Sequence, residues 1–217
     1  MEWWKILIVC VIGYMFGNIN FARIISATRK KDITTMGSGN PGTMNVLRNL
    51  GTKWAALTLI GDVVKSVIPS IIGLFWIGRT ALYAGGLSAV VGHIYPIVYK
   101  FKGGKGVASA IGVFAVAYPL VMAIGFVGGF VFLYFSKYAS ITSLILITAM
   151  SIYAGYFEPD LAIRIMIFSI WLLVWVGHRS NIIKAILGKE RKTDLAKAFS
   201  KIKTKGKKTE KTEKTEA

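Results

Sequence analysis

The sequence contains one cysteine, Cys10, which lies in the middle of an apolar run. A single cysteine cannot form an intramolecular disulfide, and a thiol inside a membrane span is a poor zinc ligand and a poor nucleophile. The two histidines, His93 and His178, are far apart in the chain, and carboxylates are few. They make a poor ligand set for a metal ion, so we predict no metal centre and no cofactor.

Acidic residues are scarce, with 10 Asp and Glu against 27 Lys and Arg, which gives a formal net charge of +17. Such an excess can indicate nucleic-acid binding, but 54% of the residues are hydrophobic, only 17% are charged and the mean hydropathy is +0.56. A soluble domain of 217 residues could not bury so many apolar side chains, so we expect most of the chain to lie in lipid. Basic residues beside membrane spans fix topology and meet anionic head groups. The expected partners are therefore membrane lipids, and no nucleic acid is expected.

Seven apolar segments can be drawn along the chain. The first lacks the small-residue cleavage site of a signal peptide and is too long for one, so we expect a retained span. Residues 107–135 would overshoot a ~30 Å hydrocarbon core as one helix at about 1.5 Å per residue. A break at Pro119 leaves two halves that are short for a full crossing and allows broken or re-entrant geometry. The segments are Trp3–Ile25, Trp54–Ile77, Thr80–Val98, Val107–Tyr118, Pro119–Phe135, Ile141–Phe157 and Leu161–Val176.

The distribution of charge favours seven crossings over six. With seven, the strongly basic loops and the basic C-terminal segment fall on one side, and the other side keeps a few charges of mixed sign. The positive-inside rule then places the N-terminus outside and the C-terminus in the cytoplasm. We therefore predict an all-α polytopic membrane protein with about seven transmembrane helices, formed by residues 1–188. Residues 189–217, rich in Lys, Thr and Glu, are predicted to be a basic, disordered cytoplasmic tail.

Two glycine-rich segments have nucleotide-like spacing without the context that nucleotide binding requires. Gly37, Gly39 and Gly42 form a G-x-G-x-x-G pattern, but a membrane span precedes them where a dinucleotide site needs a β-strand. Lys105 is followed by Gly106, where a Walker A loop needs Ser or Thr. Neither a dinucleotide nor a nucleoside triphosphate is therefore expected.

The second of these segments nevertheless has the composition of a phosphate cradle. Gly103, Gly104 and Gly106 allow backbone N–H groups to point at one anion, and the start of the next helix adds its positive dipole end. Lys105 supplies a full charge. The alternative, a basic interfacial turn, does not account for the three glycines.

Other polar residues gather at the predicted cytoplasmic ends of the spans. Ser38, Asn40, Asn45 and Arg48 form a dense hydrogen-bonding and anion-binding set, whereas a Gly/Asn-rich turn would explain the glycines but not Arg48.

Two pairs are spaced for one helix face. His178 and Asn181 are three residues apart, with Glu190 following in the same basic segment. Asp62 and Lys65, in the second span, are also three residues apart and are predicted to form an ion pair. This pair could have a purely structural role or could support a substrate site, and both alternatives stay open.

Taken together, three segments resemble, in order and spacing, the motif regions of the bacterial acyl-phosphate-dependent glycerol-3-phosphate acyltransferases. These are GSGNPG with N-x-x-R in Gly37–Arg48, GH-x-YP followed by FKGGKGVA in Gly92–Ser109, and HR-x-NI ending in G-x-E in His178–Glu190. The resemblance implies an integral protein of the bacterial plasma membrane whose active site faces the cytoplasm. It implies transfer of a fatty acyl group from acyl phosphate to the 1-hydroxyl of glycerol 3-phosphate. The implied products are lysophosphatidic acid and phosphate, and the implied reaction is an early step of phospholipid biosynthesis. An enzyme that produces acyl phosphate is an expected partner.

The resemblance also implies roles for residues at matching positions. As catalytic residues it implies Ser38, Arg48, Lys105, His178, Asn181 and Glu190. As substrate-binding residues it implies Asn40, Asn45, His93, Gly103, Gly104, Gly106 and Ser143.

The chemistry expected for these residues is direct transfer. An acyl phosphate has a good leaving group, so the attacking hydroxyl needs positioning more than a strong base. Cys10 is in a span and no Ser-His-Asp set is apparent, which disfavours an acyl-enzyme. The base is either His178 or the leaving phosphate, and which phosphate the glycine loop holds is open. The rival hypothesis is a transporter or channel for a phosphorylated solute, although no convincing internal repeat supports it.

Overall fold

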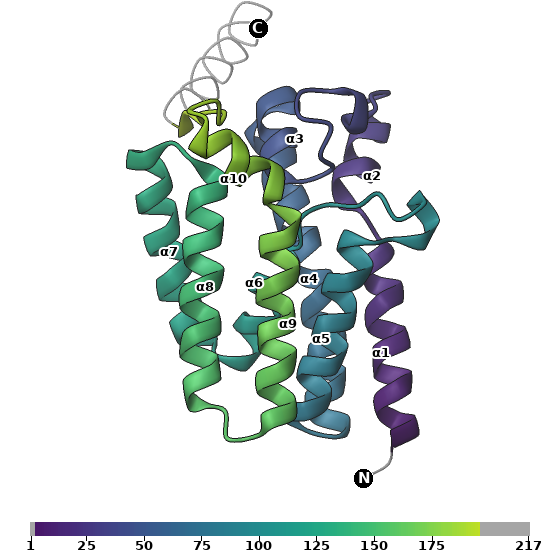
Figure 1. The fold of residues 1–217 in the computed structure, drawn as a ribbon. Helices are drawn as coiled ribbons and strands as arrows, with labels where there is room; N and C mark the ends of the chain where they lie inside the picture. Colours follow the sequence, from purple (N-terminus) through teal and green to yellow (C-terminus); the bar gives the residue numbers. More distant parts are fainter. Residues whose placement is uncertain (1–2, 196–217) are drawn as a thin grey trace, which may run out of the picture.

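The computed structural model describes residues 3–195 of the chain, and all of the regular secondary structure in that range is helical. Ten α-helices and two 3₁₀-helices occur there and no strand, in agreement with the predicted fold class (Figure 1). The α-helices are α1 (Trp3–Asn18), α2 (Phe21–Thr28), α3 (Thr43–Leu50), α4 (Thr52–Trp76), α5 (Arg79–Ile94), α6 (Val107–Ala117), α7 (Pro119–Ser136), α8 (Ala139–Phe157), α9 (Leu161–Gly177) and α10 (Arg179–Ile186). The 3₁₀-helices are η1 (Ile33–Thr35) and η2 (Ile97–Tyr99).

The long helices run side by side, and the short ones collect at one end of the bundle. In Figure 1 the start of α1 lies at the bottom, while α2, α3, α10 and the loop between α5 and α6 lie at the top. The three polar motif regions therefore meet at one end of the molecule, as the charge pattern predicted.

Five helical segments are long and apolar enough to cross a membrane, and a sixth results if α9 and α10, bent by 55°, are counted together. The five are Trp3–Thr28, Thr52–Trp76, Arg79–Tyr99, Pro119–Ser136 and Ala139–Phe157. The remaining apolar helix, α6, has 11 residues, which span about 16 Å at 1.5 Å per residue, roughly half of the hydrocarbon core. Seven crossings, and the orientation of the termini, thus stay predictions.

The helix break predicted near Pro119 is present. Tyr118 leaves the helical region with φ −144° and ψ 70°, and Pro119 starts α7, where its missing N–H needs no acceptor. The break can lie within an apolar region because protein surrounds it: most residues of α6 are buried.

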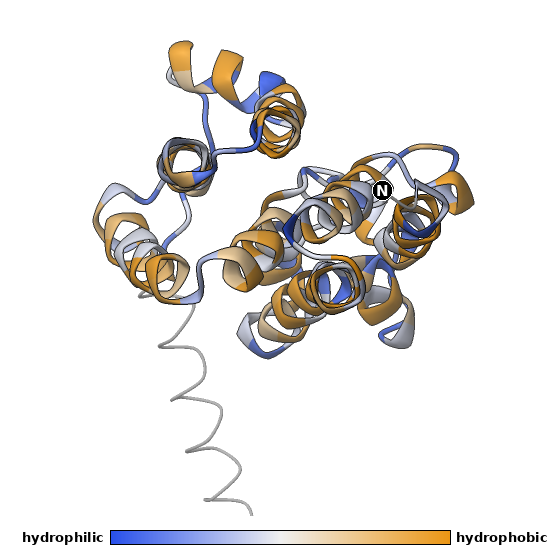
Figure 2. Ribbon diagram, turned by 90° about the horizontal axis from the view of Figure 1, so that it is seen from below, coloured by the Kyte–Doolittle hydropathy of each residue, from blue (hydrophilic) through white to orange (hydrophobic). Residues whose placement is uncertain are grey.

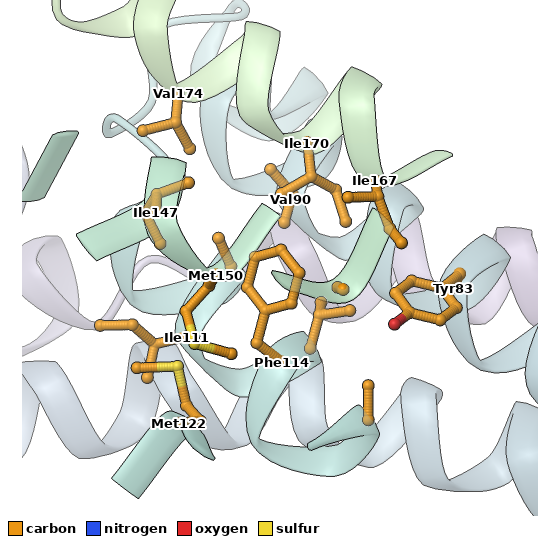
Figure 3. Close-up of a cluster of buried hydrophobic side chains, with 14 of the residues drawn as sticks. Tyr83, Val90, Ile111, Phe114, Met122, Ile147, Met150, Ile167, Ile170 and Val174 are labelled. Carbon is orange, nitrogen blue, oxygen red and sulfur yellow. The ribbon is translucent and has the colours of Figure 1, made fainter. Parts of the chain in front are cut away.

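Large apolar side chains cover the outside of the bundle. Phe75 is 85% exposed, Phe135 76% and Leu120 73%, and hydrophobic residues dominate the helical ribbons in Figure 2. Patches of this kind would be unfavourable in water and suit hydrocarbon. The buried core centres on Phe114 of α6, which lies among Val90, Met150 and Ile170 of three other helices (Figure 3).

Helices α1 and α5 approach through glycines. A Cβ atom added at Gly17 of α1 would lie 2.8 Å from the Cα of Gly92, and one added at Gly13 would lie 3.1 Å from the Cβ of Ser88. Small residues at such contacts let helix backbones pack closely in membranes.

We predict that Gly17→Leu separates α1 from α5 and destabilises the fold. Overpacking of this kind costs about 3 kcal/mol, which corresponds to roughly 6–12 °C in the thermal unfolding midpoint. Gly128→Leu is the matched control, since a Cβ there meets nothing within 4 Å. Thermal unfolding of both variants in detergent measures the effect, and equal midpoints would contradict the close packing.

Candidate active site

A cavity of about 990 Å³ opens at the end of the bundle where the motif regions meet. Every residue that the sequence implied as catalytic or substrate-binding lines it: Ser38, Asn40, Asn45, Arg48, His93, Gly103, Gly104, Lys105, Gly106, Ser143, His178, Asn181 and Glu190. The cavity continues along apolar side chains: Leu59, Ile111, Phe126, Phe130 and Leu146. The lining of the cavity is thus cationic and hydrogen-bonding at one end and apolar at the other.

Asn45 holds the glycine-rich turn of the first motif in place. Its side-chain oxygen accepts from the Ser38 backbone N–H at 3.1 Å, and its side-chain nitrogen donates to the carbonyls of Ile33 at 3.0 Å and Met36 at 2.9 Å. A second donor to the same oxygen is the amide of Asn49 at 3.0 Å. Both amide hydrogens of Asn45 are therefore used within the protein. Asn45 thus holds the backbone of Ser38 in place, and substrate binding by Asn45, which also lines the cavity, stays a prediction.

The glycine loop folds back on the end of α5. The Gly103 N–H donates to the Ile94 carbonyl at 3.1 Å and the Gly104 N–H to the His93 carbonyl at 3.0 Å. These two amides are thus used internally, which differs from the expectation that successive glycine N–H groups face an anion. The first-turn amides of α6, which have no intrahelical acceptor, are the donors that remain beside Gly106.

Lys105 starts a hydrogen-bonded chain among residues that line the cavity. Its ammonium donates to the side-chain oxygen of Asn181, the Asn181 nitrogen donates to Glu190 at 2.7 Å, and Ser140 donates to the same carboxylate oxygen at 2.8 Å. Burial lowers the pKa of Lys105 to about 8, and the charge of Glu190 opposes that shift. The carboxylate therefore both orients Asn181 and helps to keep Lys105 charged.

His178 is a neutral imidazole at the edge of the cavity. It is 3% exposed, and burial, followed by the nearby charge of Lys105, lowers its pKa to about 4. Nδ1 lies 2.8 Å from the Val174 carbonyl, which can only accept, so Nδ1 carries the ring proton. Nε2 is then the proton acceptor of the ring.

Arg48 reaches the cavity from the last turn of α3. Its guanidinium donates to the Thr193 hydroxyl at 2.6 Å and to the Arg191 carbonyl at 3.2 Å. Burial lowers the pKa of Arg48 below its usual value, but a guanidinium stays protonated in proteins. Arg48 and Lys105 thus place two cationic side chains at the polar end of one cavity.

Comparison with known proteins identifies relatives along most of the chain. The sequence model of the family described as "Glycerol-3-phosphate acyltransferase" matches residues 7–188. This chain belongs to the glycerol-3-phosphate acyltransferase family. The glycerol-3-phosphate acyltransferase of Alkaliphilus metalliredigens is 39% identical over 189 residues, which cover 86% of this chain and 95% of that protein. That of Neisseria gonorrhoeae is 37% identical over 197 residues, covering 83% and 94%.

Two solved structures share the fold of this family member. The crystal structure of PlsY (YgiH), an integral membrane glycerol 3-phosphate acyltransferase, in its glycerol 3-phosphate form has a TM-score of 0.83 and 31% identity. It covers 87% of this chain, and the match takes in 96% of that structure. The lysophosphatidic acid form has a TM-score of 0.80 at the same identity, with 88% and 97% covered. The all-α membrane fold predicted from the sequence is thereby confirmed.

A segment beyond the family match reaches the site. Residues 189–195 were assigned to the predicted tail, yet the Thr193 N–H donates to the Lys137 carbonyl at 2.7 Å and Leu195 is 7% exposed beside Leu133 and Ala139. The segment therefore joins α3, through Arg48, to the end of α7 and the start of α8. Residues 196–217, the rest of the predicted tail, lie outside the described residues.

Sequence reasoning missed three residues that support the site. Ser140 lay in a hydroxyl-rich stretch that is a weak signal by itself, and Thr193 lay in a low-complexity segment with no signal. Arg23 was included in an apolar run, but its guanidinium donates to the Lys102 carbonyl at 3.1 Å and lies over the Tyr99 ring at 4.5 Å. A charge inside a span was the available clue.

We predict that kcat/KM falls as the pH rises through about 8, because Lys105 then loses the charge that attracts phosphate. Lys105→Arg keeps its charge at higher pH, so its alkaline limb should be absent even if geometry lowers its turnover. Initial rates between pH 6 and 10, corrected for donor hydrolysis without enzyme, test this. The same alkaline limb in both proteins would rule out Lys105 as its source.

We predict that Thr193→Val raises the KM of a phosphate-bearing substrate about tenfold, because a hydrogen bond to a charged group is lost. Thr193→Ser keeps the hydroxyl and should resemble the wild type. Steady-state kinetics with each substrate varied in turn measure the change. A lower KM for Thr193→Val would instead mean that the segment competes with substrate for Arg48.

Proposed function

We propose that this chain transfers a fatty acyl group from acyl phosphate to the 1-hydroxyl of glycerol 3-phosphate and releases lysophosphatidic acid and phosphate. The observation that carries the proposal is that one cavity joins cationic side chains to an apolar wall. Both substrates carry a phosphate, and one carries a long apolar chain. Membership of the family adds that its named members are glycerol-3-phosphate acyltransferases.

The polar end offers two groups of donors for two phosphates. One group is Lys105 with the first-turn amides of α6, and the other is Arg48 with Ser38. A cation and oriented N–H groups favour an anion at each place. The acyl chain would lie along Ile111, Phe126 and Leu146. This arrangement brings the activated carbonyl to the boundary between the two ends.

The transfer itself needs one bond made and one bond broken. The glycerol oxygen attacks the acyl carbonyl carbon, the bond from that carbon to the phosphate oxygen breaks, and the hydroxyl proton passes to a base. The leaving phosphate can take this proton, and so can Nε2 of His178, which is unprotonated at neutral pH. Because phosphate is a good leaving group, positioning supplies much of the rate.

A covalent acyl-enzyme is disfavoured by the placement of nucleophiles. Cys10 lies in α1 and is not among the residues that line the cavity. Ser143 does line it, but its hydroxyl donates to the Ala139 carbonyl at 2.8 Å within α8. Direct transfer between the two bound substrates remains the simplest course.

The proposal extends to the setting of the enzyme. We infer an integral protein of a bacterial plasma membrane with the motif end in the cytoplasm, which is the side that the positive-inside rule assigns to the basic loops. Acyl phosphate would come from a partner enzyme in that compartment. The transporter hypothesis is the weaker one, because the relatives in both sequence and structure are named as acyltransferases.

The decisive experiment is an assay of the purified protein in detergent with palmitoyl phosphate and labelled glycerol 3-phosphate. Labelled lysophosphatidic acid is the expected product. Arg48→Ala should lower the rate roughly 100-fold, since a fixed charge that binds the reacting phosphate is lost. Lys31→Ala removes an exposed cation from the same end of the molecule and should retain wild-type rates. No product from the wild type, with solute uptake into vesicles, would favour the transporter.

A further inference from the structure

Three buried polar side chains, of which Asp62 and His93 border the cavity, meet between α4 and α5. Asp62, Lys65 and His93 are 1%, 2% and 4% exposed. The ammonium of Lys65 lies 2.9 Å from an Asp62 carboxylate oxygen, 2.7 Å from Nδ1 of His93 and 2.6 Å from the Ile19 carbonyl. The contacts with Ile19 and His93 are hydrogen bonds and the contact with Asp62 is an ion pair. The pair predicted from the sequence is confirmed, and His93 is its third member.

The contact with Lys65 sets the state of the His93 ring. A lysine ammonium cannot accept a hydrogen bond, so Nδ1 is the acceptor and the ring proton is on Nε2. The Asp62 oxygen lies 3.7 Å from the same Nδ1. Lys65 and Asp62 therefore hold the ring by one edge and leave the Nε2 edge toward the glycine loop.

The glycine loop packs against that edge. A Cβ atom added at Gly104 would collide with Nε2 of His93 and would lie 2.8 Å from Cε1 and 3.1 Å from Cδ2 of the same ring. Gly104 does not have the left-handed backbone that Gly106 has at φ +83°. Space beside the imidazole, and not backbone conformation, is thus what requires glycine at position 104.

The loop is held at its other end as well. Arg23 of α2 donates to the Lys102 carbonyl, one residue before Gly103. Lys65 in turn donates to Ile19, whose carbonyl lies in the break between α1 and α2. One connected set of contacts therefore links that break, α4, the end of α5 and the loop.

We propose that Asp62, Lys65 and His93 form a buried positioning unit whose imidazole seats Gly103 and Gly104, and thereby places Lys105 and the start of α6 for the substrate phosphate. None of the three needs to touch the reacting atoms. A buried ion pair contributes little to stability by itself. Its use here is to fix one ring orientation, because the lysine leaves Nδ1 no alternative partner. The kinetic part of this proposal rests on the proposed acyltransferase function.

The experiment is a double-mutant cycle between His93 and Gly104. Gly104→Ala places a methyl group against the ring and should raise the KM of a phosphate-bearing substrate about 30-fold. His93→Asn keeps an oxygen near the position of Nδ1 for Lys65 but removes the rest of the ring, and should raise that KM about tenfold. In the double variant the smaller side chain at position 93 leaves room for the methyl group, so we expect a KM close to that of His93→Asn. If the two effects were independent, the KM of the double variant would instead rise about 300-fold.

Gly106→Ala is the matched control. Glycine is needed there for a left-handed backbone, so removal of the imidazole should not rescue the variant. The proposal would be overturned if Gly104→Ala kept full activity, or if the KM effects of the changes at positions 93 and 104 multiplied in the double variant. It would also be overturned if His93→Asn rescued Gly106→Ala as well as it rescues Gly104→Ala.

Hydrogen–deuterium exchange supplies a readout that does not depend on activity. His93→Asn should speed exchange in the peptide covering residues 99–108 and leave α7 and α8 unchanged at an unaltered unfolding midpoint. Faster exchange throughout the protein would mean a general loss of stability and would contradict a positioning role. If the wild type makes no lysophosphatidic acid, the acyltransferase assignment fails, whereas the exchange data still test whether His93 seats the loop.

Discussion

The return of residues 102–104 onto the end of α5 is the interaction on which the rest of the site depends. Irregular backbone inside an apolar bundle must find its hydrogen-bond partners within the protein. The last turn of a helix has carbonyls without intrahelical donors, and those of His93 and Ile94 receive the N–H groups of Gly104 and Gly103. The loop therefore supplies the N–H donors that the end of α5 lacks, and the end of α5 supplies the carbonyl acceptors that the loop needs. As a result α6 begins just after Lys105, and Val107 and Ala108 of its first turn line the cavity.

The electrostatics of the cavity follow from this placement. Lys105 is buried deeply enough for its pKa to fall to about 8, and Glu190, through Asn181, is the counter-charge that limits the shift. Arg48 donates to a backbone carbonyl and to a hydroxyl, both of which are neutral acceptors. Cations in such surroundings gain a strong partner when an anionic substrate enters. This arrangement supports the proposal that the polar end binds phosphate and that the adjoining apolar wall holds a lipid chain.

Local patterns in the sequence predicted much of this architecture. Hydropathy identified the long helices, Pro119 marked the break between α6 and α7, and the spacing of Asp62 and Lys65 predicted their ion pair. The motif residues were expected at one end of the bundle and line one cavity there. Hydropathy alone draws α6 as a crossing, but its 11 residues span about 16 Å, roughly half of the hydrocarbon core.

The sequence by itself determined the residue types, the helical periods and the side on which charge accumulates, because each depends on neighbours along the chain. Only the tertiary structure decided which groups are partners. Asn45 uses its amide on the turn that holds Ser38, His93 meets Lys65 28 residues away, and Arg48 meets Thr193 at a separation of 145. Such contacts depend on how distant segments pack, and no local pattern encodes the distance between them. The same motif glycines can point their amides at an anion or at a helix end, and here the close approach of α5 decides it.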